Sequence, residues 1–314
     1  MVWKMATMAR RQPIRIGRRN MRRAWLFSVV ILILAATAAA QSPPRAVIVG
    51  GTRSYVINSG DTLTSIAAKH GVTTKSIVER NGLQPSRRLA TGITLVIDNP
   101  HIAIVDPRVS ITINVAQRML FFAADDAVFG YPITVGSRGW PTPLGDFTIT
   151  LMETDPTWDV PISIQREMEA QGKRVVTIVP PSPDNPLGTR WLGLSIPGVG
   201  IHGTNAPSSI YRYGSHGCIR MHPDHILELF ERVTVGMTGV LTYEPIVMAV
   251  IDGRVWLEVH PDPYRRVSNA IARARAIAGG LGATEMIRWP AVEAALRRRD
   301  GGAEDVTRTD LTLK

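Results

Sequence analysis

The chain has 314 residues, of which 45% are hydrophobic and 20% charged, and this length is sufficient for two domains. Its formal net charge is +10, but eight basic residues and no acidic ones lie within residues 1–40, so the remainder carries only about +2. The charge therefore gives no support for a nucleic-acid partner. The 27 glycines and 22 prolines favour turns and short strands.

Residues 1–40 have the three parts of a secretory signal peptide. A basic block ends at Arg23, an apolar run extends from Ala24 to Ala36, and small residues up to Ala40 form a cleavage site. We expect cleavage after Ala40 and a periplasmic location. An uncleaved inner-membrane anchor is the alternative, although the apolar run is shorter than the roughly 20 residues that span a bilayer. Met21 is an alternative start of the chain.

A linker is expected at residues 41–53, followed by a small unit at 54–98. The sequence predicts a strand at 55–57, helices over 63–70 and 74–81, and a strand at 93–97. This β-α-α-β order and its two loop motifs resemble a LysM module, which implies binding to glycan strands that contain N-acetylglucosamine. The residues of the two loops are Gly60, Asp61, Thr62, Leu63, Asn81, Gly82 and Leu83. For single residues such as Leu63, packing in the core is an equally good reading.

From Val109 the sequence alternates between apolar and polar residues, which is typical of β-strands. A proline-rich segment between Glu153 and Arg190 is too long for a simple connection, so we expect it to fold over the active site as a lid. Trp158 and Trp191 either line the site or pack the lid onto the sheet. The predicted strands are 109–115, 118–122, 128–135 and 147–151, and one helix at 223–233 presents Ile226, Leu227, Phe230 and Val233 on its apolar face.

Cys218, the only cysteine of the chain, is the candidate nucleophile. Only a thiolate attacks, and a free thiol has a pKa of about 8.5, so the sulfur needs a neighbour that takes its proton. Histidine serves best near neutral pH. We therefore expect an ionised sulfur beside an imidazole in a cleft. Gly217 would let the backbone turn sharply, so that the amides of Gly217 and Cys218 can face a developing oxyanion.

His202 and His216 are the candidate bases. His202, sixteen residues before the cysteine, can return across a sheet, so we favour it as the base, with His216 in support. Three neighbours have expected positioning or binding roles. The carbonyl of Gly203 would orient the His202 ring, Ser215 would position His216, and Arg220 would pair with a substrate carboxylate or form a surface salt bridge.

Two other interpretations compete with catalysis. A lone cysteine is often a small buried apolar residue, but an exported chain normally pairs its cysteines or has none. A zinc site is the second alternative, and its ligands would be His202, His216, Cys218, His222 and His225. Against it, Pro223 and Asp224 between the last two histidines are typical of a helix start. We expect no metal and no cofactor.

The C-terminal residues 245–314 form an extension. Val247–Ile251 and Val255–Val259 flank an Asp-Gly pair, which predicts a hairpin. The tail from Ser268 has helical stretches rich in Ala and Arg. Its candidate inward positions are Ile271, Ile277, Val292 and Leu296.

Several motifs resemble those of the L,D-transpeptidases of the bacterial cell wall, and along the chain they follow the order found in that family. They are His-Gly-Thr-Asn at 202–205, Ser-His-Gly-Cys-Ile-Arg-Met at 215–221, Pro-Thr-Pro-Leu-Gly-Asp-Phe at 141–147, and Pro-Ser-Pro-Asp-Asn-Pro-Leu-Gly at 181–188. Ser182 and Tyr211 depart from the glycines expected there. The resemblance implies a mainly β chain, in which a β-sandwich catalytic domain at 109–244 accompanies the β-α-α-β LysM domain and the C-terminal hairpin and helical extension.

The resemblance also implies the reaction. Cys218 would attack a stem tetrapeptide of peptidoglycan, release the terminal D-alanine, and pass the acyl group to an amine. The acceptor would be diaminopimelate of another stem, giving 3-3 cross-links, or a lysine of a wall-attached lipoprotein. Carbapenems would acylate Cys218. The rival functions are a carboxypeptidase or amidase that uses the same nucleophile, and a non-catalytic wall-binding protein.

Overall fold

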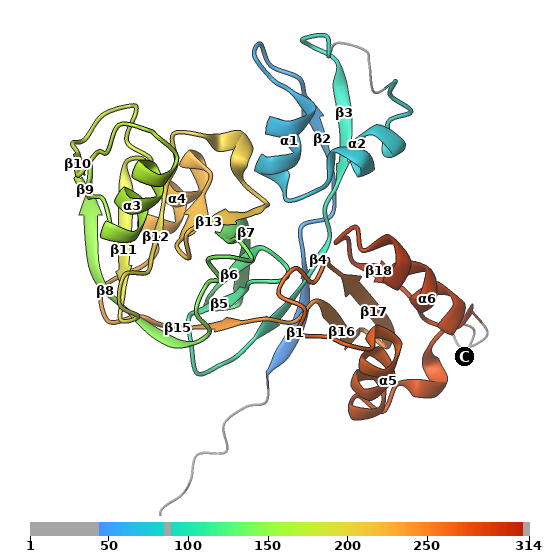
Figure 1. The fold of residues 1–314 in the computed structure, drawn as a ribbon. Coiled ribbons are helices and arrows are strands. Elements are labelled where there is room, and N and C mark those ends of the chain that lie inside the picture. The colour runs from blue at the N-terminus through green and yellow to red at the C-terminus, as the bar shows by residue number, and fades with distance from the viewer. Residues whose placement is uncertain (1–43, 85–88, 310–314) are drawn as a thin grey trace, which may run out of the picture. The chain divides into compact units, whose positions relative to one another are not determined.

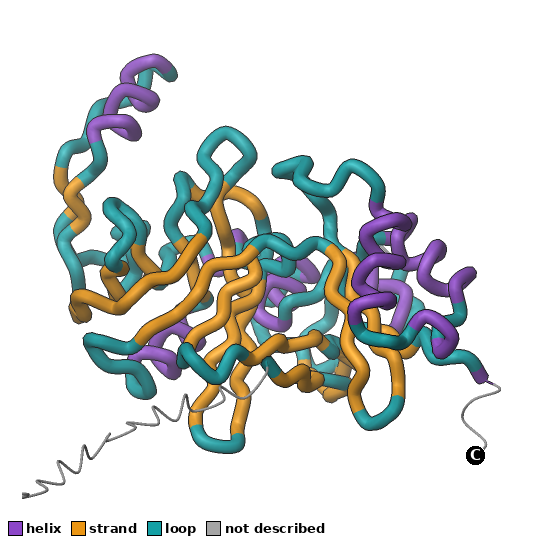
Figure 2. Tube along the Cα trace, turned by 90° about the horizontal axis from the view of Figure 1, so that it is seen from below, coloured by secondary structure: helices purple, strands orange, loops and turns teal. Residues whose placement is uncertain are grey.

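The computed structural model describes residues 44–84 and 89–309 (Figure 1). The predicted signal peptide lies outside these ranges. Within them, no helix is both long and apolar enough to cross a membrane. Strands and loops make up most of the described chain, as Figure 2 shows, so the prediction of a mainly β protein is confirmed.

The LysM unit has the predicted order of elements, which are β2 (Thr52–Val56), α1 (Leu63–His70), α2 (Thr74–Arg80) and β3 (Thr94–Asp98). β2 and β3 pair in antiparallel register, with Tyr55 opposite Leu95. Thr62 caps α1 by accepting a hydrogen bond from the amide of Ser65, and Gly71 ends the helix at φ +67°. Both helices bury apolar side chains against the two strands, so this small unit has its own core.

The catalytic region forms a nine-stranded sheet, in the order β13-β7-β14-β12-β11-β8-β15-β5-β6, which closes on itself because β6 also pairs with β7. Closure leaves the inward side chains to fill a fully buried core that includes Ile113, Ile149 and Ile201. The strands are β5 (Ile111–Asn114), β6 (Met119–Ala124), β7 (Ala127–Gly136), β8 (Gly145–Thr154), β11 (Arg190–Leu194), β12 (Gly200–His202), β13 (Tyr213–Ser215), β14 (Ile219–Met221) and β15 (Thr238–Thr242).

Helix α4 (Pro223–Phe230) packs on this core where a helix was predicted, but its buried face differs in one position. Ile226 and Leu229 are fully buried, whereas Leu227 is 40% exposed. The prediction for Leu227 was wrong because the buried face follows the i, i+3, i+4, i+7 spacing of 226, 229, 230 and 233, and residue 227 lies one position off it.

Part of the expected linker is a strand. β1 (Arg45–Val49) pairs with β4 (His101–Val105), and this two-stranded ribbon has two apolar faces. Val47 and Val49 pack toward the catalytic sheet, while Ala46 and Ile48 pack toward the C-terminal hairpin. The alternation places successive side chains on opposite faces, so one ribbon serves two cores.

The C-terminal extension forms a compact layer beside this ribbon (Figure 1). Asp252 and Gly253 both have positive φ, as the predicted hairpin turn requires. Val292 and Leu296 are buried as expected, and Ile271 and Ile277 are partly buried against the same core. The elements are β16 (Ile246–Ile251), β17 (Arg254–Val259), α5 (Ala270–Gly280), η2 (Thr284–Met286), α6 (Trp289–Arg298) and β18 (Glu304–Asp305).

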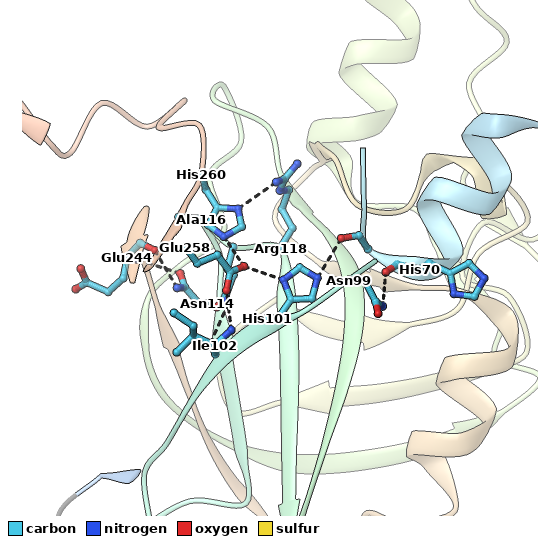
Figure 3. Close-up of polar contacts among 12 residues, drawn as sticks. His70, Asn99, His101, Ile102, Asn114, Ala116, Arg118, Glu244, Glu258 and His260 are labelled. Atoms are coloured by element: carbon cyan, nitrogen blue, oxygen red, sulfur yellow. Dashed lines mark hydrogen bonds and ion pairs between the residues drawn. The ribbon is translucent and has the colours of Figure 1, made fainter. Parts of the chain in front are cut away.

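A fully buried carboxylate, that of Glu258, joins three segments of the chain (Figure 3). It accepts hydrogen bonds from His101 Nδ1 at 2.7 Å, His260 Nε2 at 2.8 Å, Gln117 Nε2 at 2.8 Å and the Ile102 amide at 2.7 Å. Burial alone raises the pKa of Glu258, but the two imidazoles outweigh it and lower the pKa to about 2. A buried charge is tolerated when it is fully hydrogen-bonded, so this network holds β4, the β5–β6 turn and β17 together.

Candidate active site

Cys218 lies in the tight turn between β13 and β14. Gly217 before it adopts φ +111°, a conformation that favours glycine. The Ser215 hydroxyl donates to the Cys218 carbonyl oxygen at 2.5 Å and accepts from the Gly217 amide at 3.2 Å. Ser215 therefore closes the nucleophile turn, and the hydrogen bonds of its hydroxyl are to the backbone of Gly217 and Cys218. Because the Gly217 N–H is already used, the Cys218 amide is the remaining candidate of the two expected oxyanion donors.

The Pro-Thr-Pro segment anchors the same turn from a second direction. Thr142, which is 2% exposed, donates through Oγ1 to the Gly217 carbonyl oxygen at 2.9 Å and accepts from the Gly136 amide at 2.8 Å. The Tyr264 hydroxyl accepts from the Thr142 amide at 3.1 Å and donates to the Gly136 carbonyl oxygen at 2.7 Å. Sequence reasoning assigned neither residue a role. The motif around Thr142 was a usable signal, whereas Tyr264 offered none.

His202 sits on β12, opposite Trp191 of β11 and Arg220 of β14 in the strand register. Its Nδ1 lies 2.8 Å from the Gly203 carbonyl oxygen. Since a carbonyl only accepts, Nδ1 carries the proton and Nε2 is left as an acceptor. Burial, followed by the charge of Arg220, lowers the pKa of His202 to about 3. The imidazole is therefore neutral at physiological pH, as a general base must be.

Trp191 contributes to this burial. Its ring stacks on His202 with centroids 5.7 Å apart and an interplanar angle of 26°. A side chain at Gly200 would collide with the indole, because a Cβ there would lie 2.3 Å from the ring. Sequence analysis gave Trp191 no role, since its contact with His202 depends on the pairing of β11 with β12.

His216 has a different partner from that of His202. Its Nε2 lies 2.6 Å from Glu167 Oε2, and its ring centroid is 5.2 Å from that of Trp140. The hydrogen bond from His216 lowers the pKa of Glu167, so this carboxylate is ionised and accepts a hydrogen bond from the N–H group at Nε2. Glu167 belongs to α3 (Ile162–Ala170) of the expected lid, which also contains β9 (Trp158–Asp159) and β10 (Ile178–Val179). The sequence did not single out Glu167.

The thiol of Cys218 is partly exposed, and its Sγ lies 3.5 Å from the Gly198 carbonyl oxygen. Burial raises its pKa, while the Gly200 backbone and Arg220 oppose this effect only in part. Together with the lowered pKa of His202, this direction indicates a neutral thiol and a neutral imidazole in the free protein. With such a pair, the proton leaves the sulfur during the attack, and the expected ionisation of Cys218 belongs to that step.

Cys218, His202, His216 and Arg220 line one cavity of about 1240 Å³. The expected lid forms much of its remaining wall, which includes Trp158 as well as α3. Arg220 forms no ion pair with any carboxylate of residues 44–84 or 89–309, so the surface salt bridge considered for it has no partner there. Its guanidinium can therefore meet an anionic group of a bound ligand.

The five residues considered as zinc ligands do not come together as a metal site in the described part of the chain. Within the described ranges, no group of three His, Cys, Asp or Glu side chains is arranged to hold a metal ion. Nδ1 of His222 accepts a hydrogen bond from the Asp224 amide at 3.2 Å and so caps α4. His225 lies beside Tyr131, with ring centroids 5.7 Å apart.

Three of the LysM loop residues hold the module together. Asp61 accepts from the Tyr55 hydroxyl and the Asn58 amide, both at 2.7 Å, and Thr62 caps α1. The Asn81 side chain accepts from the Val96 amide at 2.7 Å and donates to the Val96 carbonyl oxygen at 2.9 Å. Leu63 and Leu83 pack on the LysM core. The groups of these loops that remain available to a ligand are therefore mainly backbone groups. They include those of Gly60 and Gly82, which both have positive φ.

The matches to known protein families divide the chain into the same two parts, the small N-terminal unit and the region of the large sheet. Residues 108–248 match the YkuD family, described as the L,D-transpeptidase catalytic domain, and residues 55–98 match the LysM domain. ErfK/SrfK of Salmonella typhimurium, a probable L,D-transpeptidase, is 34% identical over 67% of this chain and 68% of its own length. YcfS of Escherichia coli, also a probable L,D-transpeptidase, is 33% identical over 69% of this chain and 71% of its own length.

Among solved structures, the catalytic domain of the E. faecium L,D-transpeptidase acylated by ertapenem covers 42% of this chain and 94% of its own, at 24% identity and a TM-score of 0.33. The family and relative matches define an enzyme that combines a LysM domain with a transpeptidase domain. The chain belongs to the L,D-transpeptidase family.

Proposed function

We propose that the chain is a peptidoglycan L,D-transpeptidase in which Cys218 carries the acyl group. The observation that carries this proposal is the cavity, which is lined by a partly exposed thiol on a braced turn, by a neutral histidine and by an arginine that has no ion pair among the described residues. These are the parts that acyl transfer needs: a nucleophile, a base and an anchor for an anionic substrate.

In the first half-reaction, Nε2 of His202 removes the Cys218 proton as Sγ attacks the carbonyl carbon of the penultimate residue of a stem tetrapeptide. The carbon–nitrogen bond then breaks, and the terminal D-alanine leaves with the proton held by His202. In the second half-reaction an amine attacks the thioester and gives one proton to His202, a new carbon–nitrogen bond forms, the carbon–sulfur bond breaks, and the proton returns to the departing sulfur. Arg220 would hold a carboxylate of the donor peptide.

The remaining parts of the chain give this reaction a location. The signal peptide at 1–40 would export the protein to the periplasm, and the LysM loops at 60–63 and 81–83 would hold a glycan strand. The acceptor is either the side chain of diaminopimelate or a lysine of a wall lipoprotein. Purified donor offered with each acceptor separately, with products identified by mass spectrometry, decides between them.

Intact-mass measurement after exposure to a stem tetrapeptide or a carbapenem tests the nucleophile. We expect a covalent adduct on the wild-type protein that disappears in Cys218→Ala. Transfer requires a cross-linked product when an amine acceptor is present, whereas release of tripeptide alone indicates the hydrolytic alternative. An adduct that persists in Cys218→Ala contradicts the proposal, and a wild-type protein that never forms one favours wall binding without catalysis.

A further inference from the structure

One face of the lid helix α3 looks into the cavity of the thiol. The cavity-lining positions of this helix are spaced as one helical face requires, at i, i+1, i+4, i+5 and i+8. These residues are Ser163, Ile164, Glu167, Met168 and Gln171, the last of which is the C-terminal cap. Ile162, on the other side of the helix, is 62% exposed. α3 therefore walls the space in which the acyl group must sit.

α3 has no buried side chain, which distinguishes it from α4. Its apolar residues Ile164 and Met168 are only partly buried, so little fixes the position of the helix, because burial is the main source of helix stability in proteins. The polar contact between Glu167 and His216 joins it to the end of β13, two residues from Cys218. Gln171 donates to the other carboxylate oxygen of Glu167 at 3.0 Å and so orients the carboxylate for this contact.

We propose that Glu167 is a positioning residue that holds α3 over the thioester and thereby sets how much of the acyl group passes to an amine rather than to water. The inference rests on the proposed function, since it concerns the second half-reaction at Cys218. Amine and water compete for the same carbonyl carbon. In both cases the carbon–sulfur bond breaks and the nucleophile loses a proton, but water attack yields a free tripeptide and amine attack a cross-linked product.

The expected size of the effect follows from the exposure of the contact. Glu167 and His216 are both about one third exposed, and ion pairs of this kind shift an open–closed equilibrium only a few-fold. Release of α3 should therefore change the partition between products rather than abolish acylation. Water exclusion by a closed lid protects reactive intermediates from hydrolysis, so the change should favour the tripeptide.

The test compares the full-length wild type with Glu167→Gln and with a matched control, Glu169→Gln. Glu169 lies on the same helix but is exposed and does not line the cavity. Purified stem tetrapeptides serve as donor and acceptor, and mass spectrometry gives the ratio of tripeptide to cross-linked dimer. Hydrogen exchange over residues 162–171 reports the position of α3. We expect Glu167→Gln to raise the ratio about threefold or more and to speed exchange, with Glu169→Gln unchanged.

Three results would overturn the inference. An unchanged ratio in Glu167→Gln, with acyl-enzyme still formed on Cys218, refutes it and leaves the proposed function intact. A fall in both products at a constant ratio, accompanied by a lower melting temperature, shows that Glu167 serves only stability. A wild-type protein without any acyl-enzyme on Cys218 refutes the proposed function and the inference with it.

Discussion

His202 and His216 illustrate how the partner of a histidine sets its role. Burial, to which a stacked indole contributes, and the charge of Arg220 keep His202 neutral, whereas a carboxylate on a lid helix holds His216 at the cavity. The first arrangement suits a base, because a neutral imidazole can accept a proton. The second connects the lid helix to the end of β13. In the proposed reaction, the two histidines would therefore divide proton transfer and positioning between them.

The pH dependence of Cys218 alkylation tests the electrostatics of the site. Burial raises the pKa of this thiol above its ordinary value, so the thiolate fraction keeps increasing through about pH 9. We expect the rate of reaction with iodoacetamide, followed by intact mass, to rise from pH 7 to beyond pH 9 without levelling off. Cys218→Ala controls for reaction elsewhere. A plateau below pH 8 would indicate a stabilised thiolate and contradict the neutral pair.

At the scale of elements, the connection from η1 (Pro207–Ser209) to β13 contains a tyrosine where a glycine was expected. Tyr211 adopts φ +65°, the left-handed conformation that glycine takes without strain. Its ring is 6% exposed and packs with Ile210, and the Arg118 guanidinium lies 4.0 Å from the ring centroid. The side chain thus fills the space between the sheet and the β1–β4 ribbon, where a glycine would leave a gap.

Replacing Tyr211 weighs these two effects against each other. Tyr211→Gly removes about 1–2 kcal/mol of backbone strain but loses a buried aromatic ring, which costs about 3–5 kcal/mol. We expect a net loss of about 1–4 kcal/mol in the free energy of unfolding, measured by urea denaturation. Tyr211→Phe is the matched control, because the Tyr211 hydroxyl is buried without a hydrogen-bond partner among the described residues. Equal or higher stability of Tyr211→Gly would show that strain dominates.

At the scale of the whole described chain, the C-terminal extension supports both other parts. Through Glu258 it fixes the strand that leaves the LysM unit, and through Tyr264 it reaches the nucleophile turn by way of Thr142. The β1–β4 ribbon packs on both its hairpin and the catalytic sheet, which makes these contacts continuous. The extension is therefore part of the structure that carries the active site, although it lies largely outside the matched catalytic domain.

Tyr264→Phe tests this support. The substitution removes one acceptor and one donor for backbone groups but keeps the ring that stacks on Tyr243 at 4.8 Å. We expect a loss of about 1–3 kcal/mol in the free energy of unfolding. The acylation rate of Cys218 should also fall, by up to about tenfold, because a small displacement of a nucleophile is costly. Thermal melting and carbapenem acylation kinetics measure the two effects. Unchanged acylation in a destabilised variant would mean that Tyr264 stabilises the fold without positioning Cys218.

The sequence by itself determined the elements whose signals are local. Alternating residues predicted the strands of the sheet, Thr62 and Gly71 marked the ends of a helix, Asp252 and Gly253 marked a hairpin, and the motif at 215–221 pointed to Cys218. These features depend on backbone preferences and on side chains a few residues apart, so a linear pattern contains them.

The tertiary structure alone decided what surrounds the sulfur. The contact of His216 with Glu167, the stacking of Trp191 on His202, the anchor from Thr142 and Tyr264, and the strand within the expected linker all join segments that are well separated in the chain. Sequence spacing carries no signal for such contacts. The direction in which burial moves the pKa of Cys218 likewise depends on the whole folded environment, because that environment sets the cost of desolvation.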